Sequence, residues 1–174
     1  MSDSRYPIGP FVLPETFSST DLAQWIGEIE TEAASYRLLT EKLTDVQLDK
    51  TYRDGSWNVR QLVHHVADIQ FLHYLRMKKA LTEPDRGDTT LINMDGWAVL
   101  PDSVTDPIAG SLQGLEGVTQ RYVSLARGLT EAQLALTYFH PLRKIWFNQG
   151  QALAMSSWHL RHHLAHIRIA LSRT

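Results

Sequence analysis

Cysteine is absent from the 174-residue sequence. This absence excludes disulfide bonds, thiolate ligands for a metal ion and a cysteine nucleophile. A metal site in this chain must therefore be built from histidine, aspartate or glutamate side chains. Histidine is frequent, with eight residues, and the positions of these residues carry most of the functional information.

Long apolar runs and a surplus of charge of one sign are also missing. No segment approaches the roughly 18 consecutive apolar residues of a membrane helix, and residues 1–9 lack the basic-then-apolar order of a secretion signal. Seventeen basic and 19 acidic residues leave a formal net charge of -2, without the like-charge runs typical of surfaces that bind nucleic acid or anionic membranes. We therefore expect a cytoplasmic protein with no nucleic-acid or membrane partner.

Helical spacing of apolar residues predicts four long helices within one domain that covers residues 1–174. The predicted ranges are about 19–43, 57–81, 108–129 and 149–172, with Ser19 or Thr20 capping the first helix and Ser56 the second. Three prolines within residues 1–18 indicate an extended lead-in. Thr82 to Pro107 is predicted to form a long functional loop with a short helical turn near Trp97, and Tyr138 to Phe147 a short hairpin.

A short motif occurs twice with identical spacing. Its copies are Leu43-Thr44-Asp45-Val46-Gln47-Leu48 followed by Thr51-Tyr52, and Leu129-Thr130-Glu131-Ala132-Gln133-Leu134 followed by Thr137-Tyr138. Each copy follows one long helix and precedes the next, which indicates two related helix pairs that stack into an all-α four-helix bundle. The alternative is a chance recurrence of common residue types. If the pairs are related, the second helices of the two pairs are equivalent, and these helices carry the histidine clusters.

The histidines of the fourth predicted helix gather on one face. At about 100° per residue, with His159 as zero, the other three fall at about +40° (His163), -20° (His166) and -60° (His162), within the apolar arc that faces the core. Buried imidazoles need partners for both ring nitrogens, and one metal ion satisfies several rings together. Two pairs have the i, i+4 spacing that lets both rings reach one ion, His159 with His163 and His162 with His166. The spacing alone does not choose between them.

The second predicted helix supplies a third inward histidine. His65 lies among apolar residues on the helical wheel, whereas His64 lies beside Arg60 and is expected at the surface. Asp68, one turn after His65, is a candidate for orienting an imidazole through its second N–H or for acting as a general base. The simpler alternatives are an ordinary helix carboxylate for Asp68 and, for the whole cluster, a set of core or surface histidines without a metal.

The residues also resemble the DinB-like superfamily, and within it the YfiT-type metal-dependent hydrolases. The resemblance is carried by Trp57-Asn58-Val59-Arg60-Gln61-Leu62-Val63-His64-His65-Val66-Ala67-Asp68 and Trp158-His159-Leu160-Arg161-His162-His163-Leu164-Ala165-His166, together with Tyr6-Pro7-Ile8-Gly9, Tyr52-Arg53-Asp54-Gly55 and His140-Pro141. It spans nearly the whole chain. The departure is Ser56, which stands where the pattern has a second glycine before the tryptophan, in a turn that carries no ligand.

This resemblance implies a four-helix bundle, a homodimer, and one divalent metal ion, zinc or nickel, held by three histidines. Carried over residue by residue, the metal ligands fall on His65, His159 and His163. His140 is expected to be structural, as a turn histidine before proline usually is, and the roles of His162 and His166 stay open.

Three neutral histidines leave a coordination position open, as catalytic metal sites do. A metal ion there lowers the pKa of water towards about 7 or polarises a carbonyl, so we expect a metal-dependent hydrolase that acts on a small electrophilic molecule. Some relatives in the superfamily look like transferases that use a low-molecular-weight thiol such as bacillithiol, mycothiol or glutathione. In this cysteine-free chain that thiol would be a cosubstrate. A non-catalytic stress or scaffold protein, in which the ion only pins two helices together, is the third alternative.

Overall fold

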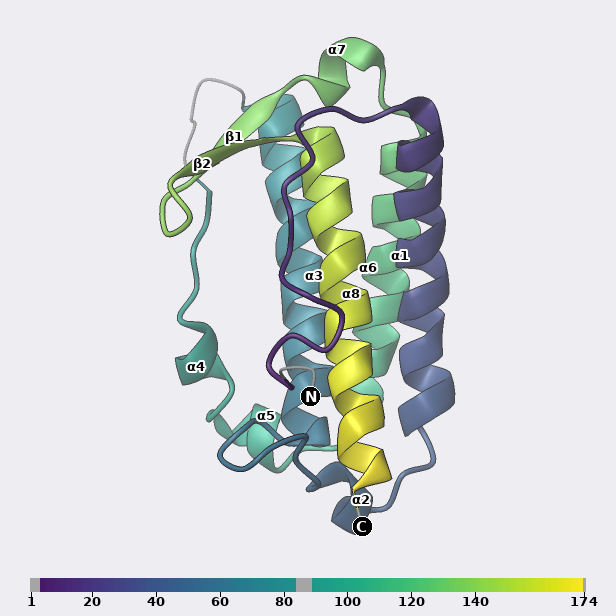
Figure 1. Cartoon of the computed structure of the whole chain (residues 1–174), viewed down its shortest axis with the longest axis vertical. Helices are drawn as coiled ribbons and strands as arrows, with labels where there is room; N and C mark the ends of the chain where they lie inside the picture. The colour runs from purple at the N-terminus through teal and green to yellow at the C-terminus, as the bar shows by residue number, and fades with distance from the viewer. Residues whose placement is uncertain (1–3, 84–88, 174) are drawn as a thin grey trace.

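Four long helices lie side by side in the computed structural model, which describes residues 4–83 and 89–173 (Figure 1). They are α1 (Ser19–Thr40), α3 (Val59–Thr82), α6 (Ala109–Arg127) and α8 (Gln149–Ser172). The predicted four-helix bundle is confirmed, and the ends of the helices differ from the predicted ranges by at most three residues. In the described part of the chain, no helix combines the length and apolar character needed to cross a membrane.

The order of the helices around the bundle differs from a simple up-and-down arrangement. Both α1 and α3 pack against α6 and α8, so the two helices of each pair, α1 with α3 and α6 with α8, occupy diagonal positions. In Figure 1, α1 and α8 run downward while α3 and α6 run upward. Corresponding helices of the two pairs, α1 with α6 and α3 with α8, therefore run in opposite directions, as a twofold axis perpendicular to the bundle requires.

The duplicated motif adopts the same conformation in both copies. Each copy forms a four-residue helix, α2 (Asp45–Leu48) and α7 (Glu131–Leu134). A threonine caps each helix, and a glutamine three residues later returns a hydrogen bond to the backbone of the cap, Thr44 with Gln47 and Thr130 with Gln133. The repeated letters therefore encode a repeated structure.

The repeat continues into the starts of α3 and α8, beyond the predicted motif. Asn58 caps α3 and Asn148 caps α8, and each asparagine makes the same reciprocal capping interaction with a glutamine three residues later. Thr51 pairs with Asn58 in an isolated antiparallel bridge, and Thr137 faces Asn148 in the hairpin formed by β1 (Thr137–His140) and β2 (Ile145–Asn148). The predicted hairpin is confirmed, and it is the longer version of the bridge in the first half.

Two predicted helix caps are wrong. Ser56 does not cap α3, because its hydroxyl donates to the Arg53 carbonyl within the preceding turn, which leaves the capping position to Asn58. The cap of α1 is Ser18, one residue before the predicted Ser19 or Thr20, and Asp21 completes its capping box.

The segment between α3 and α6 covers the outer side of α3. It contains the helical turn predicted near Trp97, which is α4 (Met94–Trp97), and a second turn that was not predicted, α5 (Pro101–Val104), which packs on α3. Pro101 at the first position of α5 suits a helix start because its missing N–H needs no partner there. Residues 84–88 of the predicted loop, with Pro84 and Gly87, lie outside the described residues.

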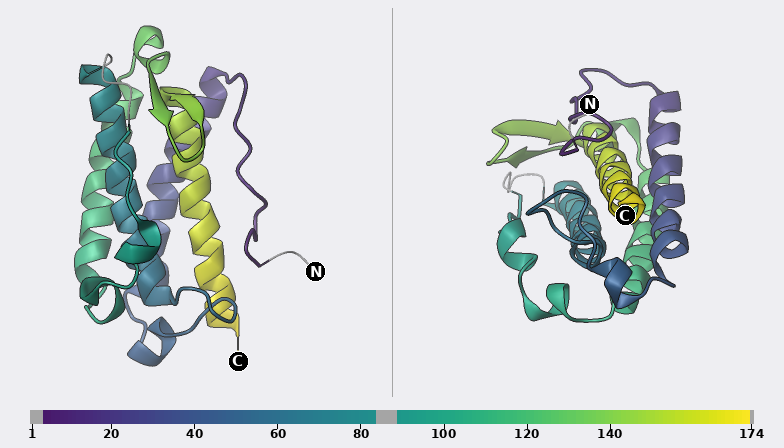
Figure 2. Two further views of the ribbon diagram at one scale, coloured as in Figure 1. Left: turned by 90° about the vertical axis from the view of Figure 1, so that its left-hand side faces the viewer. Right: turned by 60° about the horizontal axis from the view of Figure 1, so that its bottom comes forward.

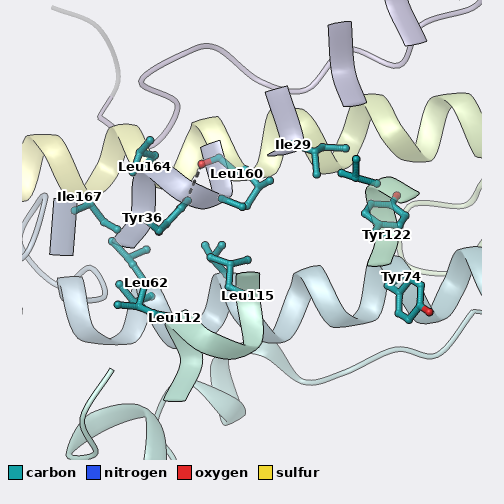
Figure 3. Packing of buried hydrophobic residues seen from close by; sticks show 14 of the residues in the cluster. Ile29, Tyr36, Leu62, Tyr74, Leu112, Leu115, Tyr122, Leu160, Leu164 and Ile167 are labelled. Carbon is teal, nitrogen blue, oxygen red and sulfur yellow. Dashed lines mark hydrogen bonds between the residues drawn. The ribbon is translucent and has the colours of Figure 1, made fainter. Parts of the chain in front are cut away.

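Buried tyrosines help to hold the helices together (Figure 3). Tyr36 of α1 is fully buried, and its hydroxyl donates a 2.7 Å hydrogen bond to the Leu160 carbonyl of α8. Tyr122 of α6 has the equivalent place in the second pair, because both tyrosines stand seven residues before the leucine that opens the motif. The Tyr122 hydroxyl lies near Ser156 but makes no hydrogen bond of normal geometry to any described residue.

This difference gives a matched pair of substitutions. We expect Tyr36→Phe to lower the free energy of unfolding by about 1–1.5 kcal/mol, because it removes a fully buried hydrogen bond. Tyr122→Phe removes a hydroxyl without such a bond and is expected to change the free energy of unfolding by less than about 0.5 kcal/mol. Urea unfolding followed by circular dichroism measures both. Equal losses of unfolding free energy in the two variants would contradict the conclusion that only the Tyr36 hydroxyl makes a stabilising hydrogen bond.

Candidate metal centre

The structure brings His65, His159 and His163 together between α3 and α8. One ring nitrogen of each residue lies within 4.8 Å of the corresponding nitrogens of the other two. The Nε2 atoms of His65 and His159 are 3.2 Å apart. Two nitrogen ligands at about 2.0–2.1 Å from a tetrahedral ion are separated by roughly 3.3–3.4 Å, so this spacing is already close to that of a bound pair. The local reason is helix geometry: His159 and His163 share a face of α8, and the antiparallel α3 presents His65 to that face.

Burial keeps these imidazoles neutral. It lowers the pKa of His65 to about 4, with a smaller contribution from His162. Burial, and then the neighbouring imidazoles, hold the pKa of His159 and His163 well below the ordinary histidine value. A neutral imidazole has one nitrogen with a free lone pair, which is the form that binds a metal ion. The site therefore supplies three ligand atoms without a competing proton.

The other i, i+4 pair has different partners. A second group of nitrogens, from His162, His163 and His166, also lies within 4.8 Å, but both of its unshared members are stacked on aromatic rings. His162 stacks on Trp158 with ring centroids 4.4 Å apart, and His166 stacks on Tyr52 at 3.9 Å. These rings pack beneath the N-terminal segment, which runs along the outside of α8 (Figure 2).

A chain of hydrogen bonds leads from the N-terminal segment to a predicted ligand. His166 Nε2 lies 3.1 Å from the Ser4 carbonyl oxygen, which only accepts, so His166 carries its proton on Nε2. Nδ1 of neutral His166 then accepts, and it lies 3.3 Å from Nδ1 of His163, which must donate. His163 is therefore left with an unprotonated Nε2. Orienting contacts of this kind fix the tautomer of histidine ligands in metal sites.

His64 was predicted at the surface, and this prediction is wrong. It is 6% exposed, and its Nδ1 lies 2.7 Å from the Ser111 hydroxyl of α6. The helical-wheel prediction for His64 was wrong because α6 and the segment before it cover the face of α3 that was predicted to be solvent-exposed. Arg60 on the same face is also 6% exposed, since it pairs with Asp45 at 2.7 Å and donates to the Asp106 carbonyl at 3.0 Å.

Asp68 lies on the side of α3 that faces the segment between α3 and α6. Burial, and then repulsion from Asp102 of α5, raise the pKa of its carboxyl to about 6. A carboxyl group with this pKa changes its charge near neutral pH, as a general base must.

A cavity of about 260 Å³ reaches the histidine cluster at His159. His159 lines it together with residues of α3, α8, the hairpin and the segment around Ile92. Its polar lining includes His73 and Arg76 of α3 and His140 and Arg143 of the hairpin. Of these residues, the sequence had singled out only His140, which was expected to be structural.

His73 is the histidine that the sequence reasoning missed. It is 7% exposed, its ring centroid lies 5.7 Å from that of His159, and its Nδ1 has no hydrogen-bond partner among the described residues. The duplicated sequence pattern could have identified His73. His73 stands fifteen residues after the cap Asn58, and His163 stands fifteen residues after the cap Asn148.

The four-helix bundle and its histidine cluster define the class, and the chain belongs to the DinB superfamily, whose family model matches residues 28–167. The resemblance found in the sequence is thereby confirmed. A protein of Halalkalibacterium halodurans is 44% identical over 172 residues, which cover 99% of each chain. YfiT of Bacillus subtilis strain 168 is 39% identical over 165 residues, covering 93% of this chain and 90% of YfiT. Both proteins carry the name "Putative metal-dependent hydrolase".

The solved structure of YfiT shares this fold. It superposes with a TM-score of 0.91 at 38% sequence identity, over 95% of this chain and 94% of that one. YfiT is described there as a probable metal-dependent hydrolase with an unusual four-helix bundle topology.

The hydrogen-bond chain through His166 predicts a tautomer that can be observed without metal. We expect His163 of the metal-free protein to carry its proton on Nδ1 in long-range proton–nitrogen NMR spectra. His166→Phe keeps the stacking on Tyr52 but removes the acceptor, so the Nε2-protonated form of His163 should increase. His162→Phe is the matched control and should leave the tautomer unchanged. An unchanged His163 tautomer in His166→Phe would show that the chain does not set it.

The raised pKa of Asp68 predicts a pH-dependent stability. Because the pKa in the folded state, about 6, lies above the ordinary value of 3.8, the stability of the fold falls as the pH rises from about 4 to about 6. Asp68→Asn removes this penalty. After discounting for partial exposure, we expect its metal-free form to be about 1–2 kcal/mol more stable than wild type at pH 7.5, and equally stable at pH 4.

Urea unfolding in the presence of a chelator measures this difference. Asp95→Asn, an exposed carboxylate of α4, is the control and should stay within about 0.5 kcal/mol of wild type at both pH values. A difference between wild type and Asp68→Asn that is the same at pH 4 and pH 7.5 would contradict the raised pKa.

Proposed function

We propose that this chain binds one divalent metal ion through His65, His159 and His163 and hydrolyses a small electrophilic substrate. The observation that carries the proposal is the convergence of three neutral imidazoles at the edge of a cavity, with ligand atoms within 4.8 Å of one another. The names of the relatives in Halalkalibacterium halodurans and Bacillus subtilis support the same activity.

The residues present fit such an ion. Buried imidazole nitrogens are costly without partners, and the Nε2 atoms of His65 and His159 face each other at 3.2 Å, where one ion can bind both. A set of three imidazoles suits zinc and nickel, which are the metals we propose. Three protein ligands also leave room for a further ligand, in contrast to closed structural sites with four.

Each part of the site has a separate task. When bound, the ion supplies Lewis acidity, which polarises an electrophile and lowers the pKa of water. His65, His159 and His163 hold it, and His166 orients His163. The apolar walls of the cavity, including Met155 and Trp158, exclude bulk water from the reacting group. We further propose that Asp68, one turn after His65 and with a pKa of about 6, serves as the proton acceptor, although it belongs neither to the histidine cluster nor to the lining of the cavity.

Metal analysis of tag-free protein is the first test. Plasma mass spectrometry is expected to find about one ion per chain in wild type and in the control His162→Ala. His65→Ala, His159→Ala and His163→Ala should each hold less than about a tenth of that amount. Full occupancy in all three ligand variants, or an empty wild type after reconstitution with zinc or nickel, would overturn the site.

Turnover assays separate the candidate functions. Small esters and amides are screened with and without low-molecular-weight thiols, before and after chelation. A hydrolase acts without thiol, loses at least about a hundredfold in kcat/KM on chelation and recovers with metal. Turnover only in the presence of thiol would instead support the thiol S-transferase. A protein that unfolds on chelation and converts no electrophile would support the scaffold role.

A further inference from the structure

The cavity beside the histidines has a size that suits a small molecule. Its volume of about 260 Å³ is slightly below the range of ligand pockets, which measure roughly 300–1,000 Å³, and so suits a small molecule. Most of its lining is apolar, including Ile69 and Met155, while its charged groups are Arg76 of α3 and Arg143 of the hairpin. His159 also lines the cavity, so one bound molecule can reach both the arginines and the metal centre.

Arg76 is half-buried and incompletely satisfied. It donates one hydrogen bond of 2.9 Å, to the Thr90 carbonyl, while its Nε is buried without a partner among the described residues. No carboxylate within residues 4–83 and 89–173 forms an ion pair with Arg76 or with Arg143. Other arginines of the bundle are paired, such as Arg37 with Glu116 and Arg127 with Glu30. A half-buried guanidinium is costly without a counter-charge and stays protonated.

The neighbouring groups do not offset this positive charge. Burial, and then the two arginines, lower the pKa of His140 to about 4. His140 is therefore neutral at physiological pH, and no carboxylate of the described residues lines the cavity beside the two arginines.

We propose that the cavity binds a small substrate that carries a carboxylate, with the carboxylate held by Arg76 and Arg143 and the electrophilic group directed to His159. The planar guanidinium donates paired hydrogen bonds that match a carboxylate, and these charge-assisted bonds are stronger than neutral ones. The apolar walls select a short hydrocarbon segment between the two ends. This inference names a substrate class for the proposed hydrolase and rests on that function, but the anion site itself is testable without metal.

Binding of hexanoate is compared with binding of its neutral isostere hexanamide. Both are titrated into the full-length protein, once with a chelator and once after loading with zinc, and followed by NMR of methyl-labelled methionine. Met155 and Met94 line the cavity and report binding there, whereas Met77 is buried in the main core and serves as the internal control. We expect hexanoate to bind about tenfold more tightly than hexanamide in both metal states.

Arginine variants test which side chains cause the preference for hexanoate over hexanamide. Arg76→Gln should bring hexanoate and hexanamide to within about twofold, Arg76→Lys should restore part of the difference, and Arg143→Gln should reduce it. Arg121→Gln, an arginine of α6 that contacts the Tyr74 ring, is the matched control and should keep the full preference. Because Arg143 is exposed on the hairpin, its variant tests the site even if Arg76→Gln fails to fold.

The outcomes separate this proposal from the metal site. Equal binding of the two probes to wild type, or a preference that survives in Arg76→Gln and Arg143→Gln, overturns the carboxylate site. A preference seen only with zinc and independent of the arginines places the anion on the metal, which also overturns it. If no metal binds but the chelated protein keeps its arginine-dependent preference, the carboxylate site stands and the proposed hydrolase fails.

Discussion

Burying an imidazole between helices requires a partner for each of its ring nitrogens, and this requirement organises the space around α8. Its histidines lie in or beside the packed interior, where water does not reach both nitrogens. His166 meets the requirement through the Ser4 carbonyl and His163, whereas His162 stacks on Trp158 and its Nδ1 has no partner among the described residues. His159 and His163 face His65 instead. One face of α8 therefore packs its histidines against aromatic rings, while a neighbouring face presents the candidate metal ligands.

The N-terminal segment takes on a structural task in this arrangement. Its backbone carbonyls accept hydrogen bonds from α8 side chains at three levels, through Ser4, Gly9 and Pro14. Prolines and glycine keep this segment from forming a helix. Its carbonyl groups therefore stay free to accept hydrogen bonds from α8. A segment that looks like a passive lead-in therefore fixes the outer surface of α8.

Much of the fold followed from the sequence because its signals are local. Apolar spacing places the four helices, and the repeated Thr-x-x-Gln boxes account for the two short helices. The inward direction of His65 also follows from its position on a single helix. The burial of His64 did not follow, because it depends on α6 and the covering segment, which come from distant parts of the chain. The cavity was not predictable for the same reason, since four separate segments build it.

The duplicated helix pairs relate the cavity to the candidate metal ligands. Counted from the caps Asn58 and Asn148, the predicted ligands stand at positions 7 (His65), 11 (His159) and 15 (His163) of their helices. The same positions on the opposite helices hold Met155, Ile69 and His73, and all three line the cavity. The candidate metal ligands and these three cavity residues therefore occupy equivalent positions in the two helix pairs. The equivalent positions hold three imidazoles in the candidate metal centre, and two apolar side chains together with His73 in the cavity, so a molecule in the cavity lies beside the candidate ligand His159.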